Sequence, residues 1–117
     1  MLEGRVRSII IKMWPWRSRW HVVAKVGDLA RDSLIPVSVG DLELVLGRDG
    51  DRYFAVQRRC AHRGADLATG FLAKSELVCP QHGWQFSTTS GKSSRFPQAC
   101  LGVYAVRVVG DQIEIKR

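Results

Sequence analysis

Two short stretches of this 117-residue chain decide how it folds: CAHRGA at residues 60–65 and CPQHGWQF at residues 79–86. Each stretch carries one cysteine and one histidine, and the four residues are Cys60, His62, Cys79 and His82. Thiolates and imidazoles are side chains that bind transition metals. Glycine and proline lie among them, which is typical of loops. The two stretches therefore predict a metal centre held between two loops.

The distribution of ligand types separates two kinds of metal site. A structural zinc finger also uses two cysteines and two histidines, but usually takes the cysteines from one unit and the histidines from the other. Here each loop mixes the types, so both cysteines can bind one iron of a 2Fe–2S cluster and both histidines the other. The sequence favours this cluster, with Cys60, His62, Cys79 and His82 as ligands. The alternative is a structural zinc-binding interaction module.

The neighbours of these residues suit an iron–sulfur cluster. Gly64 and Gly83 follow the histidines closely, and we expect them to let backbone amides approach the cluster sulfurs. Pro80 restricts the backbone of the second loop. Trp84 and Phe86 come next in the sequence and predict an apolar cover that keeps water from the iron.

From Trp20 onward the sequence is typical of short strands separated by turns. Residues 42–46 and 53–56 flank the turn sequence RDGD, which predicts a β-hairpin, with residues 42–46 beginning as a half-buried strand. A second hairpin is predicted where valine and isoleucine alternate with polar residues on both sides of Gly110. Further strands are expected at residues 21–26, 35–39 and 76–78. With no long helical period, the chain is predicted to be all-β, an antiparallel sandwich or barrel.

The net charge of +7 is concentrated near the N-terminus. The first nineteen residues contain five cations and one acid, and we expect residues 1–19 to form a basic arm preceding a domain at 20–117. Trp14, Trp16 and Trp20 lie among these cations. Aromatic residues among cations can bind nucleic acid or a membrane surface. We favour packing at the edge of the first strand, and we expect no nucleic-acid partner.

The cysteine count and the hydropathy bear on location. No stretch approaches the roughly 18 apolar residues that cross a bilayer, so we expect no membrane anchor and a cytoplasmic protein. Three cysteines, an odd number, argue against a disulfide scaffold. Cys100 stands apart from the other two, and we expect it to be a small buried residue.

The two loop stretches resemble the Rieske domain of ring-hydroxylating oxygenases and their ferredoxins. The similarity extends over about residues 20–117. It implies an antiparallel β-sandwich with a small cluster-binding subdomain formed by two loops, at residues 58–70 and 79–86, and a covering loop at 91–97. Respiratory-chain Rieske proteins differ, because they carry a disulfide and cluster-bonding hydroxyl groups. Ala65 and Gln81 stand at the places of those cysteines, and Trp84 and Phe86 at those of the hydroxyl residues.

The resemblance implies a soluble electron carrier, a ferredoxin, rather than a catalyst. A Rieske oxygenase, such as an aromatic hydrocarbon dioxygenase, also needs a mononuclear iron bound by two histidines and a carboxylate. The chain has three histidines, and the one outside the loops, His21, is expected in a strand. We expect single electrons to pass from a flavin-dependent or other reductase to a terminal oxygenase. The alternative is a Rieske domain or small subunit of a larger oxygenase or nitrite reductase.

Five cations lie in or near the predicted loops, and we expect them to surround the exposed edges of the two histidines. They are Arg58, Arg59, Arg63, Lys92 and Arg95. Such a ring would attract an acidic partner surface. The alternatives are that these cations are simply solvated, or that the basic arm makes the contact.

Overall fold

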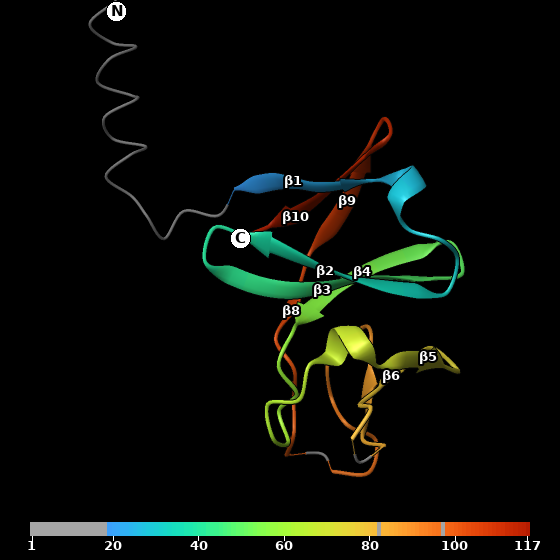
Figure 1. Ribbon diagram of the computed structural model, residues 1–117, viewed down its shortest axis with the longest axis vertical. Helices are drawn as coiled ribbons and strands as arrows, with labels where there is room; N and C mark the ends of the chain where they lie inside the picture. The colour runs from blue at the N-terminus through green and yellow to red at the C-terminus, as the bar shows by residue number, and fades with distance from the viewer. Residues whose placement is uncertain (1–18, 82, 97) are drawn as a thin grey trace, which may run out of the picture.

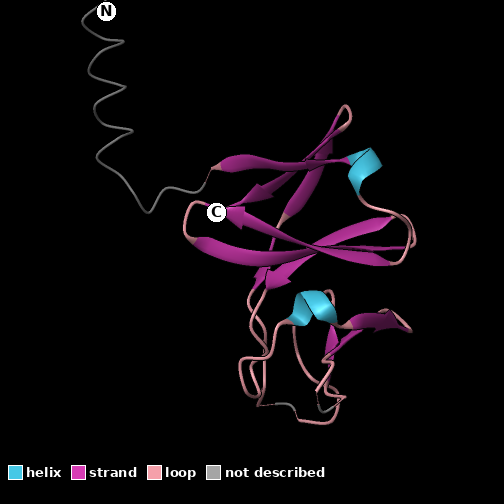
Figure 2. Ribbon diagram, viewed as in Figure 1, coloured by secondary structure: helices cyan, strands magenta, loops and turns pink. Residues whose placement is uncertain are grey.

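The computed structural model describes residues 19–81, 83–96 and 98–117, and these residues form strands with short 3₁₀ helices (Figure 1). The elements are β1 (Trp20–Lys25), η1 (Val26–Asp28), β2 (Ser33–Val39), β3 (Leu42–Asp49), β4 (Arg52–Gln57), η2 (Leu67–Thr69), β5 (Phe71–Ala73), β6 (Glu76–Val78), β7 (Gln85–Ser87), β8 (Val103–Tyr104), β9 (Val106–Val109) and β10 (Gln112–Lys116). Within the described ranges the strands form three antiparallel sheets, ordered β1-β10-β9, β2-β3-β4-β8 and β5-β6-β7. Figure 2 shows that strands and loops make up nearly all of the described chain. The predicted all-β antiparallel fold is confirmed.

Both predicted hairpins are present. β3 pairs with β4 across the turn at Gly50, and β9 pairs with β10 across the turn at Gly110. The strands expected at residues 21–26, 35–39 and 76–78 correspond to β1, β2 and β6. Pro36 lies in β2, which is at an edge of its sheet, where a missing N–H costs no ladder hydrogen bond. The predicted arm at residues 1–19 lies outside the described residues, apart from Arg19.

The β3–β4 hairpin is buried on both faces, whereas its sequence suggested a half-buried strand. Leu44 and Leu46 pack with Ile113 and Ile115 on one face, towards the sheet β1-β10-β9. Val45, between them in sequence, belongs to a second apolar cluster on the opposite face. Because successive side chains of a strand point to opposite sides, one hairpin can serve as the wall between two cores.

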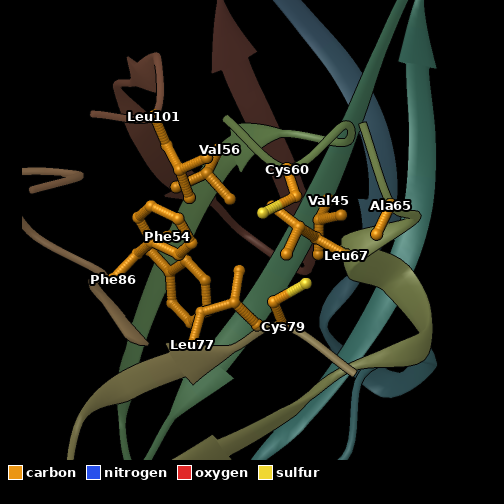
Figure 3. Packing of buried hydrophobic residues seen from close by; sticks show 10 residues of the cluster. All are labelled: Val45, Phe54, Val56, Cys60, Ala65, Leu67, Leu77, Cys79, Phe86 and Leu101. Carbon is orange, nitrogen blue, oxygen red and sulfur yellow. The ribbon is translucent and has the colours of Figure 1, made fainter. Parts of the chain in front are cut away.

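The second cluster joins the hairpin to a lower lobe that contains η2 and the sheet β5-β6-β7 (Figure 1). Figure 3 shows its ten buried members: Val45, Phe54, Val56, Cys60, Ala65, Leu67, Leu77, Cys79, Phe86 and Leu101. Two of the candidate ligands are thus part of the core that holds the lobe against the hairpin.

The lower lobe is connected to the sheet β2-β3-β4-β8 through two adjacent strands of that sheet. The chain enters the lobe after β4 and returns in β8, and β4 pairs with β8 through Val56 and Val103. At this junction the Gln57 N–H donates to the Gly102 carbonyl over 2.9 Å. The Gly102 N–H donates in turn to the Gln57 side-chain oxygen over 2.6 Å. The lobe is therefore an insertion whose two ends are held side by side. Among the residues that the structure describes, no helix is long and apolar enough to cross a membrane.

Gly47 in β3 offers a test of how Phe54 packs in the second cluster. The Phe54 ring lies over Gly47 so closely that a Cβ there would be 2.1 Å from the ring carbon Cζ. We expect Gly47→Ala to lower the free energy of unfolding by about 2 kcal/mol, because the ring must leave its place in the core. Gly27→Ala is the matched control, since a Cβ at Gly27 meets nothing within 4 Å. Denaturant unfolding of the two variants checks this, and equal stabilities would contradict it.

Candidate metal centre

Cys60 and Cys79 come from different loops and share one buried cluster. Cys60 lies three residues after the end of β4, and Cys79 directly follows β6. Their exposed fractions are 4% and 2%, and both are free thiols. Figure 3 shows both sulfurs inside the ring of apolar side chains. The fold therefore brings together two cysteines that are nineteen positions apart in the sequence.

The two loops close with the same backbone hydrogen bonds. In each, the cysteine N–H donates to the carbonyl five residues later, and the cysteine carbonyl accepts from the glycine four residues later. The bonds are Cys60 N–H to Ala65 O (2.8 Å), Gly64 N–H to Cys60 O (2.8 Å), Cys79 N–H to Trp84 O (2.8 Å) and Gly83 N–H to Cys79 O (3.1 Å). The loops are thus two copies of one local structure.

Glycine is required in both loops for its conformation. Gly64 and Gly83 have φ values of 71° and 69°, in the left-handed region that glycine adopts without strain. A Cβ at either position would meet nothing within 4 Å, so space is not the reason. Their own amides donate to the carbonyls of the cysteines. The glycines shape the loops, because they let each loop turn back on its cysteine.

His62 lies beside Cys60 and is partly buried. Its backbone N–H is 3.4 Å from the Cys60 Sγ. Its ring stacks on that of Trp84, with centroids 4.0 Å apart and an angle of 9° between the planes. The fourth predicted ligand, His82, lies outside the described residues. The structure therefore brings Cys60 and Cys79 into one buried cluster, with His62 next to the first loop's cysteine and both predicted aromatic covers, Trp84 and Phe86, packed at this cluster. Among the described residues, no group of three such side chains is already arranged around a metal position.

The local environment opposes an isolated thiolate at Cys60. Burial raises the pKa of the Cys60 thiol above its usual value, and the adjacent Cys79 side chain raises it further. The backbone N–H groups of His62 and Arg63 act in the opposite direction and lower this pKa. Two adjacent buried thiols can both ionise when a metal cation compensates their charge. The donor set and its apolar surroundings therefore fit an iron–sulfur centre.

Comparison with known families decides what this arrangement is. Residues 19–105 match the Rieske [2Fe-2S] domain, which covers most of the chain. The chain belongs to the Rieske family. Its cofactor is therefore a Rieske-type 2Fe–2S cluster, which confirms the resemblance and the cofactor predicted from the sequence.

The similar proteins include both parts of larger enzymes and separate ferredoxins. Methylxanthine N1-demethylase NdmA of Pseudomonas putida is 43% identical over 77 residues, or 62% of this chain and 22% of that protein. The ferredoxin component of an alkene monooxygenase system from Xanthobacter autotrophicus is 30% identical over 94 residues, or 80% of this chain and 77% of the relative. A chain in the complex of reduced oxygenase and oxidized ferredoxin of carbazole 1,9a-dioxygenase aligns with a TM-score of 0.75 and 30% identity, covering 82% of this chain and 91% of that one. This chain thus aligns with about a fifth of the NdmA sequence, but with most of the alkene monooxygenase ferredoxin component.

The structure also tests the predicted environments of two residues outside the loops, His21 and Cys100. His21 lies in β1, opposite Ile115 of β10, so its prediction as a strand residue is confirmed. The prediction that Cys100 is buried is wrong, because Cys100 is exposed. Its neighbour Leu101 takes the buried position instead, and adjacent residues of an extended segment point to opposite sides.

An ion pair at the base of the first loop was not predicted. Arg58 donates to both carboxylate oxygens of Asp66 over 2.9 Å, and a Leu67 N–H bond to the Arg58 carbonyl closes the same base. Asp66 also accepts from the Ala68 N–H over 3.0 Å, at the start of η2. Arg58 had been counted among the cations around the histidine edges. In the structure its charge is compensated by Asp66 and, at 3.6 Å, by Glu43, so it adds little net positive charge there.

This ion pair predicts a pH-dependent contribution to stability. The hydrogen bond from Arg58 is the main cause that lowers the pKa of Asp66 from 3.8 to about 2. A lowered pKa in the folded state stabilises the fold above pH 4, and this contribution is lost as the pH falls towards 2. We expect Asp66→Asn to cost about 1 kcal/mol at pH 7, after allowance for partial exposure, and the deficit to shrink below pH 4.

The asparagine keeps an oxygen that can accept from Ala68, so this variant isolates the charge. Asp51→Asn is the control, because Asp51 pairs with Arg31 at 3.2 Å with its side chain 84% exposed. Unfolding measured between pH 2 and pH 7 checks both variants. A deficit in Asp66→Asn that stayed constant with pH would contradict the assignment.

Proposed function

We propose that this chain is a one-electron carrier whose cluster is held by Cys60, His62, Cys79 and His82. The observation that carries the proposal is the pair of buried cysteines in matching loops beside the His62 ring. In this arrangement the cysteines anchor the buried iron and the histidines bind the outer iron. When bound, the cluster supplies a reversible one-electron couple.

The surrounding side chains support this role. Phe86 and Leu77 are fully buried beside both cysteines and exclude water from the thiolate side. His62 is only partly buried, so the histidine side is the part of the centre nearer to solvent. An electron carrier needs such an asymmetry, because its cluster must be protected yet close to the surface where a partner binds.

The ligand assignment has a direct test. The purified protein is expected to contain two irons and two acid-labile sulfides, as a Rieske centre requires. We expect His62→Ala and His82→Ala to lose the visible Rieske spectrum, while His21→Ala, which changes a β1 residue, keeps it. One zinc without sulfide would contradict the cluster. A His21→Ala protein that lost its colour while His82→Ala kept it would contradict the ligand set.

A terminal oxygenase is the electron acceptor that we infer. Support comes from the likeness to the alkene monooxygenase ferredoxin component and to a chain in the oxygenase–ferredoxin complex of carbazole dioxygenase. A flavin-dependent or other reductase as donor and a cytoplasmic location stay predictions.

A second candidate is a Rieske domain or small subunit of a larger oxygenase, which the 43% identity to NdmA favours. The two candidates differ in an electron-transfer assay. As a ferredoxin, the isolated chain transfers electrons between added reductase and oxygenase. As an enzyme domain or subunit, it accepts electrons but passes them on only within an assembly that carries the catalytic iron.

Three exposed cations of the first cluster loop and the predicted covering loop suggest the kind of surface that this partner presents. Arg63 directly follows His62, and the Arg59 side chain, near Cys60, is 60% exposed, with Glu43 at the ion-pair limit of 4.0 Å. The Arg95 guanidinium lies 5.9 Å from the ring of Phe96, which belongs to the predicted covering loop. We infer that these cations meet an acidic patch on the acceptor and raise the association rate.

Salt dependence tests this inference. We expect electron transfer to the acceptor to slow as salt rises from about 0.01 M to 0.15 M, since the screening length falls from about 30 Å to about 8 Å. Arg59→Glu and Arg95→Glu should each slow it further, with an unchanged visible spectrum. Arg31→Glu is the matched control, because its side chain is 62% exposed but lies far from the cluster loops in sequence. If truncation of residues 1–12 abolished the salt dependence and the loop reversals had no effect, the basic arm would be the docking surface.

A further inference from the structure

Three aromatic rings form a stack that begins at His62. The Trp84 ring lies between those of His62 and Phe96, with centroids 4.0 Å and 3.9 Å away and planes within 9° and 14° of parallel. His62 belongs to the first cluster loop and Trp84 to the second. Phe96 belongs to the predicted covering loop. One indole therefore joins three loops that are separate in the sequence.

Trp84 is held in place by contacts that do not involve His62. Its carbonyl accepts the Cys79 N–H over 2.8 Å, which closes the second loop. Its side chain packs against the buried cluster of the lower lobe, with the Phe86 ring 6.4 Å away at 34°. The indole plane is therefore fixed by the lobe, and it can act as a reference surface for the imidazole.

Phe96 supports the far face of the indole and is itself anchored. Its N–H donates to the hydroxyl oxygen of Ser93 over 3.3 Å, and Ser93 is buried. Its carbonyl accepts the Ala99 N–H over 2.8 Å. A ring packed on both faces cannot tilt without breaking one of two stacking contacts. Phe96 thus limits the motion of Trp84, and through it the motion of His62.

We propose that Trp84 is a positioning residue that fixes the plane of the His62 imidazole before and after the cluster binds. This inference rests on the proposed role of His62 as a ligand. A stacked aromatic pair is stabilised beyond the area it buries, enough to favour one ring orientation several-fold. Residues that orient a metal ligand commonly change metal affinity by about 10- to 100-fold when they are removed. A flat ring is needed for this role, whereas any large apolar side chain would exclude water.

That difference defines the experiment. Trp84→Leu keeps an apolar side chain but removes the flat face, and Trp84→Phe restores a flat face. We expect Trp84→Leu to lose its cluster to excess chelator about tenfold faster than the wild type. Its reduced state should give a broader electron paramagnetic resonance spectrum, because the imidazole takes several orientations. Trp84→Phe should recover most of the wild-type rate and line width.

Trp20→Leu is the matched control. Trp20 lies in β1, where Arg107 and Lys116 face its ring at 4.2 Å and 6.0 Å, and the same substitution there should leave both measurements unchanged. Phe96→Leu leaves the indole itself intact. It should speed cluster loss and broaden the electron paramagnetic resonance spectrum, as Trp84→Leu does, but by a smaller factor. It keeps the proposal testable if Trp84→Leu does not fold.

Two results would overturn the proposal: wild-type line width and cluster loss in Trp84→Leu or Phe96→Leu, or equal defects in Trp84→Leu and Trp84→Phe. The second would mean that Trp84 acts by its size alone. Failure of the ligand assignment gives a different result, because His62→Ala would then keep its cluster whatever the Trp84 variants show.

Discussion

The burial of the β3–β4 hairpin on both faces is the constraint on which the rest of the molecule depends. Leu44, Val45 and Leu46 are consecutive in the sequence. Leu44 and Leu46 belong to the core that faces the sheet β1-β10-β9, and Val45 belongs to the core of the lower lobe. A shift of one residue in the pairing of this hairpin would exchange the two sets of side chains. Both cores hold the register in place, so the same pairing that stabilises the sandwich also sets where the chain enters the lobe, three residues before Cys60.

The two cluster loops turn back on their cysteines with the same backbone hydrogen bonds, although the spacing between cysteine and histidine differs. His62 is two residues after its cysteine and His82 is three residues after, but the left-handed glycine comes four residues after the cysteine in both loops. The backbone of each loop therefore satisfies its own N–H and carbonyl groups beside the cysteine. This leaves the cysteine side chains available for metal and allows the loops to lie inside an apolar cluster with few unsatisfied polar groups.

Sequence reasoning found the parts of this structure that follow from local patterns. The hairpins at Gly50 and Gly110 were predictable because turn residues and alternating apolar residues agree there. β5, β7 and β8 have two or three residues each, too few for any period to show. From the sequence, Arg58 and Asp66 could not be distinguished from solvated charges, because their ion pair forms only when the two ends of the loop meet in the fold. The stack of His62, Trp84 and Phe96 was not predicted for the same reason. The sequence indicates that the aromatic residues cover the centre, and only the fold shows that the three rings are parallel.

The junction between β4 and β8 has a consequence for how this domain can change. The lobe between residues 58 and 102 begins and ends at two strands that are hydrogen-bonded to each other, so the strand pairing at its base does not depend on what the lobe contains. Loss of the metal can then unfold the lobe alone, while the sandwich keeps its own core of Leu44, Ile113 and Ile115. The same geometry makes the lobe a natural unit of exchange between proteins. A recipient sheet needs a pair of neighbouring antiparallel strands to receive the two ends, and an apolar face like that of Val45, Phe54 and Val56 for the lobe to pack on.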